Sequence, residues 1–229
     1  MTRLLTLLTI LAAIVLAPRE VSSQEARYRW EIGAQLGMSG YTGDANSGFM
    51  FRSPGFAASA LGRYVFDSRW ALRLQAGMMT LSGDTQNMNT ALPSGENYSF
   101  HSTLGLFEAR GEFNFFPYGI GETYKRLRRW TPFVSLGLSG GVSSSDGKSY
   151  GAFGIPVGIG VKFKPRERLN LGIELTVAKT LIDHLDGEKL SDLYMIKSSF
   201  FKNTDTYSAL TISLTYEFGE RCTVCNRID

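Results

Sequence analysis

The sequence is poor in the side chains that build metal centres and nucleophilic active sites. Its 229 residues include two cysteines and two histidines. A structural zinc site needs about four ligands, and Cys222 and Cys225 have no histidine near them. We therefore expect no metal and no cofactor. Beyond the N-terminus, no apolar run reaches the roughly 18 residues that suggest a transmembrane helix, so none is predicted.

The N-terminus has the three-part layout of an export signal. A short positive segment, 1–3, precedes the apolar run 4–17, and residues 21–23 place small side chains before Gln24. This is the pattern of a secretory signal peptide, and the run is too short to span a bilayer comfortably. We predict that residues 1–23 are a signal peptide and that the mature protein is exported.

A strong charge of one sign is also absent. Because the predicted signal holds Arg3, Arg19 and Glu20, the mature chain keeps 22 basic and 20 acidic residues, a net charge of +2 against +3 for the whole sequence. A nucleic acid partner would favour a clustered basic face, so we expect none. No small-molecule substrate is expected either.

Eight stretches of about ten residues alternate apolar and polar side chains, the pattern of strands with one apolar face. In the last stretch, Leu210, Ile212 and Leu214 alternate with Thr211 and Ser213. The stretches cover 28–39, 56–66, 70–79, 103–115, 132–142, 153–164, 169–178 and 208–218. We predict an all-β fold, an eight-stranded antiparallel transmembrane β-barrel of the outer-membrane type, built as an up-and-down meander over residues 24–218.

The connections between these stretches alternate in length. Outer-membrane barrels have long outer loops and short periplasmic turns. Long polar segments are expected at 41–54, 81–102, 143–150 and 179–206, and short turns at 67–69 and 165–168. The segment 117–129 is an exception, since it should be a short turn but is long and basic. An even number of strands then places both termini, and the tail 219–229, on the periplasmic side of the cell outer membrane.

The aromatic residues gather at one end of the predicted strands. The three tryptophans, Trp30, Trp70 and Trp130, fall at the ends next to the predicted periplasmic turns, together with Tyr216 and Phe218. Amphipathic rings prefer the interface between lipid and water, so these residues are predicted to form a membrane girdle. Further members are expected to be Tyr28, Phe66, Phe113, Phe115 and Phe163.

The polar parity of the strands carries charges of both signs. A barrel of about eight strands has an interior just wide enough for its side chains, and buried charges need partners. The lumen is therefore predicted to be plugged by ion pairs instead of forming a pore. The charged side chains expected inside are Arg29, Arg63, Arg73, Arg110, Lys162, Lys164, Glu31, Glu108, Glu112, Glu174 and Glu217.

Two features on the predicted periplasmic side suit contacts with a partner protein. Cys222 and Cys225 form a C-x-x-C pair after the last strand. A disulfide within the tail or to a partner is favoured over an inert tail, and metal or redox chemistry comes last. The long basic turn suits either a solvated surface or an electrostatic docking surface. Its cluster consists of Lys125, Arg126, Arg128 and Arg129.

Both ends of the mature chain resemble one family. Residues 31–37, EIGAQLG, with the following 41–44, YTGD, are similar to the start of PorG-like proteins, and residues 216–226, YEFGERCTVCN, are similar to their end. PorG-like proteins are outer-membrane components of the type IX secretion system of Bacteroidetes. The resemblance implies an anchor or scaffold that docks lipoprotein and partner subunits of the periplasmic ring, because so narrow a lumen cannot pass a protein.

Two other functions stay open at this point. A small passive or adhesive barrel, of the OmpA/OmpX kind, would bind surfaces through its long outer loops. Some small outer-membrane barrels modify lipid A with a histidine and a Ser, Asp or Glu, and this chain offers His101 with Ser102 and Glu108. Glu108 lies several residues deeper than His101, and His184 falls in a polar loop, so we predict that the chain is not an enzyme.

Overall fold

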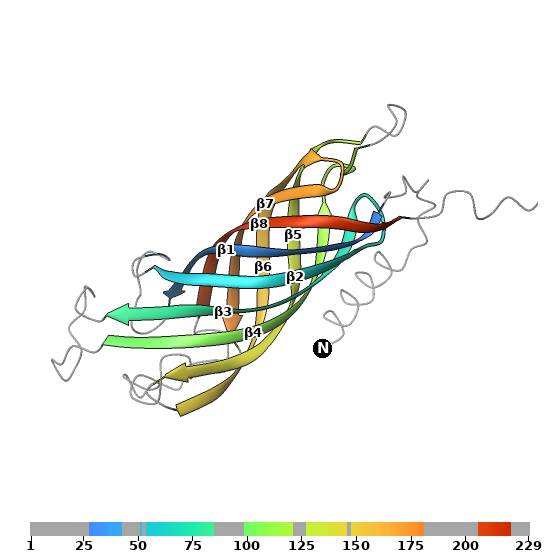
Figure 1. The fold of residues 1–229 in the computed structure, drawn as a ribbon. Helices are drawn as coiled ribbons and strands as arrows, with labels where there is room; N and C mark the ends of the chain where they lie inside the picture. Colours follow the sequence, from blue (N-terminus) through green and yellow to red (C-terminus); the bar gives the residue numbers. More distant parts are fainter. Residues whose placement is uncertain are drawn as a thin grey trace, which may run out of the picture.

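Eight antiparallel strands close into a single barrel in the computed structural model of the chain (Figure 1). The structure describes residues 28–42, 51, 54–84, 99–120, 127–145, 148–180 and 206–220. The strands are β1 (Tyr28–Thr42), β2 (Gly55–Val65), β3 (Trp70–Asp84), β4 (Ser99–Asn114), β5 (Trp130–Ser145), β6 (Lys148–Arg166), β7 (Leu169–Thr180) and β8 (Thr206–Glu220). Each strand pairs with its neighbours in sequence and β1 pairs with β8, so the predicted up-and-down meander is confirmed.

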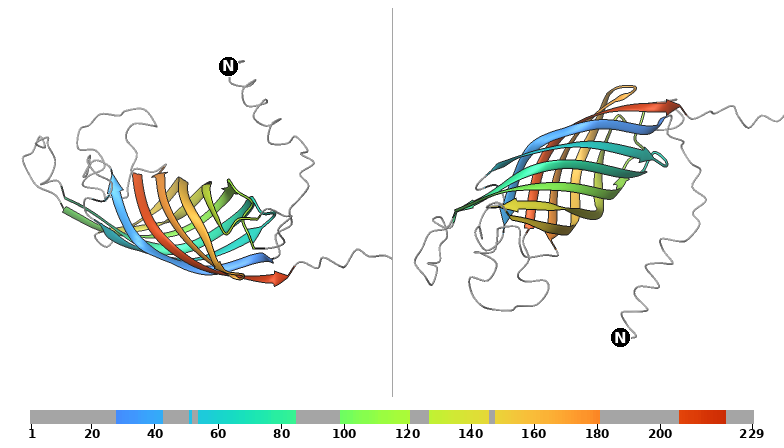
Figure 2. Two further views of the ribbon diagram at one scale, coloured as in Figure 1. Left: turned by 90° about the horizontal axis from the view of Figure 1, so that it is seen from above. Right: turned by 60° about the horizontal axis from the view of Figure 1, so that its bottom comes forward.

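The barrel has two unlike ends. One end holds the short β2–β3 and β6–β7 connections, the start of β1 and the end of β8, where Tyr28 pairs with Glu220. We call it the turn end, and the opposite one the loop end. At the loop end, β3 and β4 stay paired as far as Asp84 and Ser99, and Figure 2 shows this pair reaching beyond its neighbours. No helix within the described ranges has the length and hydropathy needed to cross a membrane.

Apolar side chains cover the outside of the barrel. On β5, Leu136 and Leu138 are 60% and 67% exposed, whereas Ser135 and Ser139 on the opposite parity are buried. The same alternation runs along the other strands, as the sequence pattern predicts. A continuous apolar surface of this kind is unfavourable in water and is typical of a barrel whose outer face contacts lipid.

Several strands are longer than the sequence pattern indicated. The prediction of a long loop over 143–150 is wrong, because β5 continues to Ser145 and β6 begins at Lys148, with Ser143 opposite Tyr150. A strand segment with polar residues on both faces fits a position outside the lipid, where water surrounds it. Apolar alternation therefore marks the apolar-faced part of a strand and misses its polar extension.

Two side chains on the predicted outer parity are buried. Tyr28 is 4% exposed, because the Arg168 guanidinium lies 5.0 Å from its ring centroid and Nε donates to its hydroxyl at 3.2 Å. Ser208 shares the parity of Leu210, yet its buried hydroxyl donates to the Gly40 carbonyl at 3.4 Å. Both residues lie near strand ends, where the simple division into two faces breaks down.

Candidate functional site: a closed lumen and the rim at its turn end

Glu112 on β4 lies at the centre of a buried ion network. Its carboxylate has Arg63 Nε at 2.7 Å, Arg73 Nη1 at 3.1 Å, and the Lys162 ammonium as a third partner. Arg63 pairs in turn with Glu31 on β1. Strands β2, β3 and β6 therefore supply cations to one fully buried carboxylate, which ties distant parts of the barrel wall together.

A second carboxylate, Glu174 on β7, binds two arginines from other strands. Arg73 donates to both of its oxygens, at 2.6 and 2.8 Å, and Arg110 Nη1 approaches to 3.3 Å. Ser135 donates a further hydrogen bond at 2.8 Å, and Arg110 also pairs with Glu108. Bidentate pairing of arginine with carboxylate is the strong form of this ion pair. It joins β3 to β7 across the interior.

The predicted interior charges are confirmed with one exception. Ten of the eleven form ion pairs inside the barrel, and the pair nearest the turn end joins Lys164 to Glu217. Arg29 is half-buried and takes part in none of these pairs. Breaking a buried pair by removing one partner costs about 3–5 kcal/mol, since the other charge is left uncompensated. The network therefore stabilises the barrel only as a complete set.

At the loop end, apolar side chains close the interior. The buried cluster, which we call the plug, consists of Tyr41, Leu81, Leu104, Ala152, Ala178 and Tyr207. Sequence reasoning missed it, because most of these residues fall in or beside predicted loops. The available signal was parity, since Leu81 keeps the inward phase of Arg73 once β3 is extended. Tyr207 joins plug and network, because its hydroxyl donates to Glu108 at 3.0 Å.

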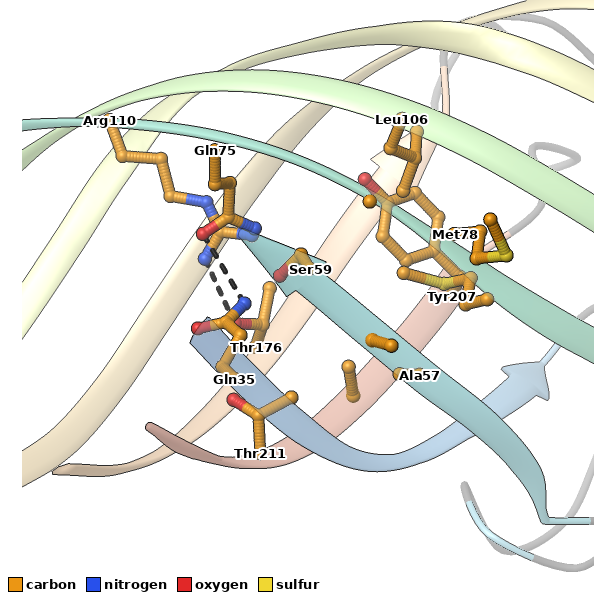
Figure 3. A pocket seen from close by; sticks show the side chains of 14 residues that line it. Gln35, Ala57, Ser59, Gln75, Met78, Leu106, Arg110, Thr176, Tyr207 and Thr211 are labelled. Carbon is orange, nitrogen blue, oxygen red and sulfur yellow. Dashed lines mark hydrogen bonds between the residues drawn. The ribbon is translucent and has the colours of Figure 1, made fainter. Parts of the chain in front are cut away.

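A small cavity of about 30 Å³ lies between the ion network and the plug (Figure 3). The polar side chains of Gln35, Gln75, Arg110 and Thr176 gather on one side of it, and Tyr207 lies on the other with Leu106 and Met78. Arg110 donates to the Thr176 hydroxyl at 2.9 Å, and Gln35 donates to Gln75 at 3.4 Å. A single water needs about 10–15 Å³ of such space. The cavity has room for about two waters, so side chains fill most of this part of the described lumen.

In the connection between β4 and β5, the described residues 115–120 and 127–129 pair with each other at the turn end of the lumen. Tyr118 forms an isolated bridge with Arg128, and its buried hydroxyl donates to Asn170 Oδ1 at 2.8 Å. Asn170 donates in turn to Glu217 at 2.9 Å. Burial raises the pKa of the Tyr118 phenol, and the Glu31 and Glu217 carboxylates act in the same direction, so the hydroxyl stays a neutral donor. This long connection thus places a buried side chain in the turn end of the lumen.

The residues predicted for the membrane girdle lie together at the turn end. Trp30 lies opposite Phe218 in the β1–β8 pairing, and Trp70 and Trp130 stand at the first positions of β3 and β5. All point outward and are 43–53% exposed, as is Tyr216. These five side chains lie at the same end of the barrel, and the girdle itself stays a prediction.

The structure places two of the residues predicted to contact a partner. Arg128 and Arg129 are exposed at the turn end, and the Arg128 guanidinium lies 4.3 Å from the ring centroid of Phe116. Among the described residues, no group of three or more His, Cys, Asp or Glu side chains is placed to hold a metal ion. The remaining predicted contact residues lie outside the described part of the chain: Lys125, Arg126, Cys222 and Cys225.

Solved structures with a similar fold are small outer-membrane barrels. Neisserial surface protein A matches with a TM-score of 0.51 and 13% identity, over 82% of this chain and 97% of that one. Ail of Yersinia pestis gives 0.45 and 12%, over 84% and 100% of the two chains, and OprG of Pseudomonas aeruginosa gives 0.44 and 11%, over 86% and 99%. At these identities the similarity concerns the fold, which is that of an outer-membrane-type barrel.

At the level of sequence, no curated protein matches the chain. One family profile does match, and it covers nearly the whole of the sequence, from residue 6 to residue 227. The chain therefore belongs to the family described as Domain of unknown function (DUF6089).

Proposed function

We propose that this protein is an outer-membrane anchor and scaffold of the type IX secretion machinery and is not itself the conduit. The filled lumen carries the second half of this proposal. Ion pairs, the plug and Tyr118 fill it among the described residues, and the cavity between network and plug has room for about two waters. The resemblance of residues 31–44 and 216–226 to PorG-like proteins supports the first half. A barrel that passes nothing through its centre can serve secretion only through its surfaces.

The outer face supports insertion into a membrane. Large apolar side chains are exposed along all eight strands, from Trp30 and Trp70 at the turn end to Met78 and Phe153 further along the barrel. Burying apolar surface in lipid gains roughly 25 cal/mol per Å², which a barrel in water would forgo. We assign the turn end to the periplasm, because short turns occupy that side in outer-membrane barrels.

Docking would then use the surfaces that the turn end offers. The β4–β5 turn is held in place by Tyr118, whose hydroxyl is anchored on Asn170 inside the lumen. This fixes the turn that carries Arg128 and Arg129 below the barrel. The tail 219–229 follows β8 at the same end and brings Cys222 and Cys225, for which we propose a covalent tether to a subunit of the periplasmic ring.

The experiment is a pull-down of the tagged full-length chain from detergent-solubilised outer membranes, with and without reductant. We expect periplasmic ring proteins to co-purify, and a cross-linked species to disappear with reductant. The double variant Cys222→Ser/Cys225→Ser should lose that species and secrete less. The two single variants are matched controls. If Cys222 and Cys225 bond to each other, either single variant loses that disulfide, and the ring protein still co-purifies.

Two results would count against this function. Wild-type protein that brings down no ring component would contradict the scaffold role as a whole. A double cysteine variant with an unchanged complex and normal secretion would contradict the tether and leave docking to the basic turn.

A second candidate function, adhesion, is favoured by the long ladder at the loop end. The β3–β4 pairing continues through Ser82 opposite His101 to Asp84 opposite Ser99, so the connection 85–98 sits on a stiff hairpin. Replacing 85–98 with a two-residue Asn-Gly turn should preserve this ladder. Adhesion to surfaces should then fall while secretion stays normal if the loops bind a surface, and neither should change if the scaffold role is the whole function.

The catalytic alternative gains no support from the described residues. The Ser102 hydroxyl lies 2.7 Å from the Ser143 hydroxyl inside the barrel. Glu108 is engaged by Arg110, Gln75 and Tyr207. Both candidate partners of a lipid-modifying histidine are therefore used within the interior. Mass analysis of lipid A from cells carrying His101→Ala tests this point directly, and an altered lipid A would overturn it.

A further inference from the structure

The turns at the turn end hold arginines against aromatic rings. In the β6–β7 turn, Arg168 donates to the hydroxyls of Tyr28 at 3.2 Å and Tyr216 at 3.3 Å. In the β4–β5 turn, the guanidinium of Arg128 stacks on Phe116. Phe116 packs edge-on against Trp130, with ring centroids 5.1 Å apart. Both guanidinium groups are therefore positioned beside girdle residues before any ligand arrives.

The β2–β3 turn carries a third arginine, which directly precedes a girdle residue in sequence. Arg69 is exposed and immediately precedes the outward-facing Trp70. The carboxylate of Asp67 fixes this turn, since it accepts the backbone N–H of Arg69 at 2.6 Å and that of Trp70 at 2.7 Å. Each of the three connections thus carries one arginine near the girdle: Arg168 contacts Tyr216, Arg128 stacks on the Phe116 ring that packs against Trp130, and Arg69 precedes Trp70 in sequence.

Cations outnumber carboxylates on these connections. Within 66–69, 115–120, 127–129 and 166–168, the acidic residues are Asp67 and Glu167. The same segments expose five arginines, Arg69, Arg128, Arg129, Arg166 and Arg168. An excess of positive charge at the circumference of the barrel attracts anions that lie in the same plane.

The depth of these arginines indicates which anion they meet. Tyr216 and Trp130 face outward at the edge of the apolar belt, and a side chain held against such a ring lies at the circumference and not beneath the mouth. Amphipathic rings mark the headgroup level of a bilayer. Guanidinium groups match phosphate oxygens with a planar fork of N–H donors. Phosphate groups of lipids are the anions present at that level.

We propose that Arg69, Arg128 and Arg168 bind the phosphate groups of anionic phospholipids in the leaflet at the turn end. Phosphatidylglycerol is the lipid class that fits, because its net negative charge balances the excess of arginine, whereas phosphatidylethanolamine brings an ammonium of its own. Of the two arginines placed on the docking surface above, Arg128 then binds lipid, and Arg129, with Arg166 at the end of β6, stays available for contacts with proteins. The bound lipids would hold the barrel at a fixed depth and orientation in the membrane while an assembly is docked to its turn end.

This inference rests on the proposed insertion into a membrane and is independent of the role in secretion. A chain that fails to insert would show no motionally restricted boundary lipid of either class, whereas an inserted chain without lipid preference would contradict the arginine site alone. The two failures are therefore distinguishable in one experiment.

The test is spin-label spectroscopy on the full-length protein in vesicles of phosphatidylethanolamine and phosphatidylglycerol. Spin-labelled phosphatidylglycerol and phosphatidylcholine are compared for association with the barrel. We expect the anionic label to be enriched in the wild type, by about fivefold at each engaged arginine site. The triple variant Arg69→Gln/Arg128→Gln/Arg168→Gln should lose most of this preference, and the double variant Arg129→Gln/Arg166→Gln should keep it.

Further arms separate geometry from bulk charge and from misfolding. The variant Arg69→Lys/Arg128→Lys/Arg168→Lys keeps the charge and should retain a reduced preference, since lysine is a point charge without the planar fork. Heat-dependent migration on gels verifies that each variant is folded. Equal association of both labels with the wild type, or equal loss in the triple-Gln and double-Gln variants, would overturn the proposal. The proposal would also be overturned if the triple-Gln variant kept its preference for phosphatidylglycerol and lost a co-purifying protein, since the three arginines would then bind protein.

Discussion

The middle of the lumen and its loop end are both filled, but by side chains of opposite character. Around Glu112 and Glu174, arginines and a lysine converge on carboxylates from several strands. At the loop end, Leu81, Leu104 and Tyr207 pack without any charge among them. The stability of the first region depends on every buried charge having a partner. The stability of the second depends on how completely its side chains fill the space. Substitutions should therefore fail for different physical reasons in the two regions.

The largest effect is expected in the charged region. Glu112→Gln removes the carboxylate shared by Arg63, Arg73 and Lys162 while keeping its shape. Leaving buried cations uncompensated should lower the free energy of unfolding by about 3–5 kcal/mol, measured by denaturant titration in detergent micelles. Glu167→Gln, the same change in an exposed turn, should shift it by less than about 0.5 kcal/mol. Equal effects of the two variants would show that the network does not govern stability.

A smaller effect is expected in the plug. Leu104→Ala should leave a cavity at the loop end and lower the free energy of unfolding by about 2–4 kcal/mol. Leu136→Ala makes the same chemical change on the outer face, where detergent or lipid can fill the space, and should cost clearly less. If the outer substitution proves as costly as the inner one, Leu104 is not part of a tightly packed plug.

The smallest effect is expected at the turn end. Tyr118→Phe removes the hydroxyl that donates to Asn170 and should cost about 0.5–1.5 kcal/mol. Its more specific result should be faster proteolysis within 117–129, because the turn loses its anchor in the lumen. Tyr64→Phe, on the outer face of β2, serves as the control. Unchanged proteolysis of the Tyr118 variant would mean that the turn is held by its backbone contacts alone.

The two regions also differ in how far the sequence pattern predicts which side chains face inward. Charged residues such as Arg73, Arg110 and Glu112 stand between apolar neighbours, so alternation alone assigns them to the inside, and the structure confirms it. Leu81 follows the same phase as Arg73 but lies beyond the predicted stretch 70–79, and Leu104 lies near the start of the stretch 103–115, where its neighbours Thr103 and Gly105 give no apolar outward face. Both side chains point inward because β3 and β4 continue as paired strands into the polar segment.

The partners of the interior charges were not predictable from the pattern. Glu112 on β4 meets Lys162 on β6, and Arg73 on β3 meets Glu174 on β7, so the pairs join strands that are not neighbours. Parity decides only that a side chain faces inward. The stagger and tilt of the closed barrel decide which inward side chains meet. The fold of Tyr118 into the lumen depends on the same geometry, which the sequence of the turn does not encode locally.

The central claim is that the lumen is sealed, and ion conductance across a planar lipid bilayer tests it most directly. The purified, folded protein should insert without producing any steady current, and Glu112→Gln, although less stable, should not open a channel either. A stable conductance carried by the wild-type barrel would contradict a packed lumen and, with it, the assignment of the protein as a scaffold in place of a pore.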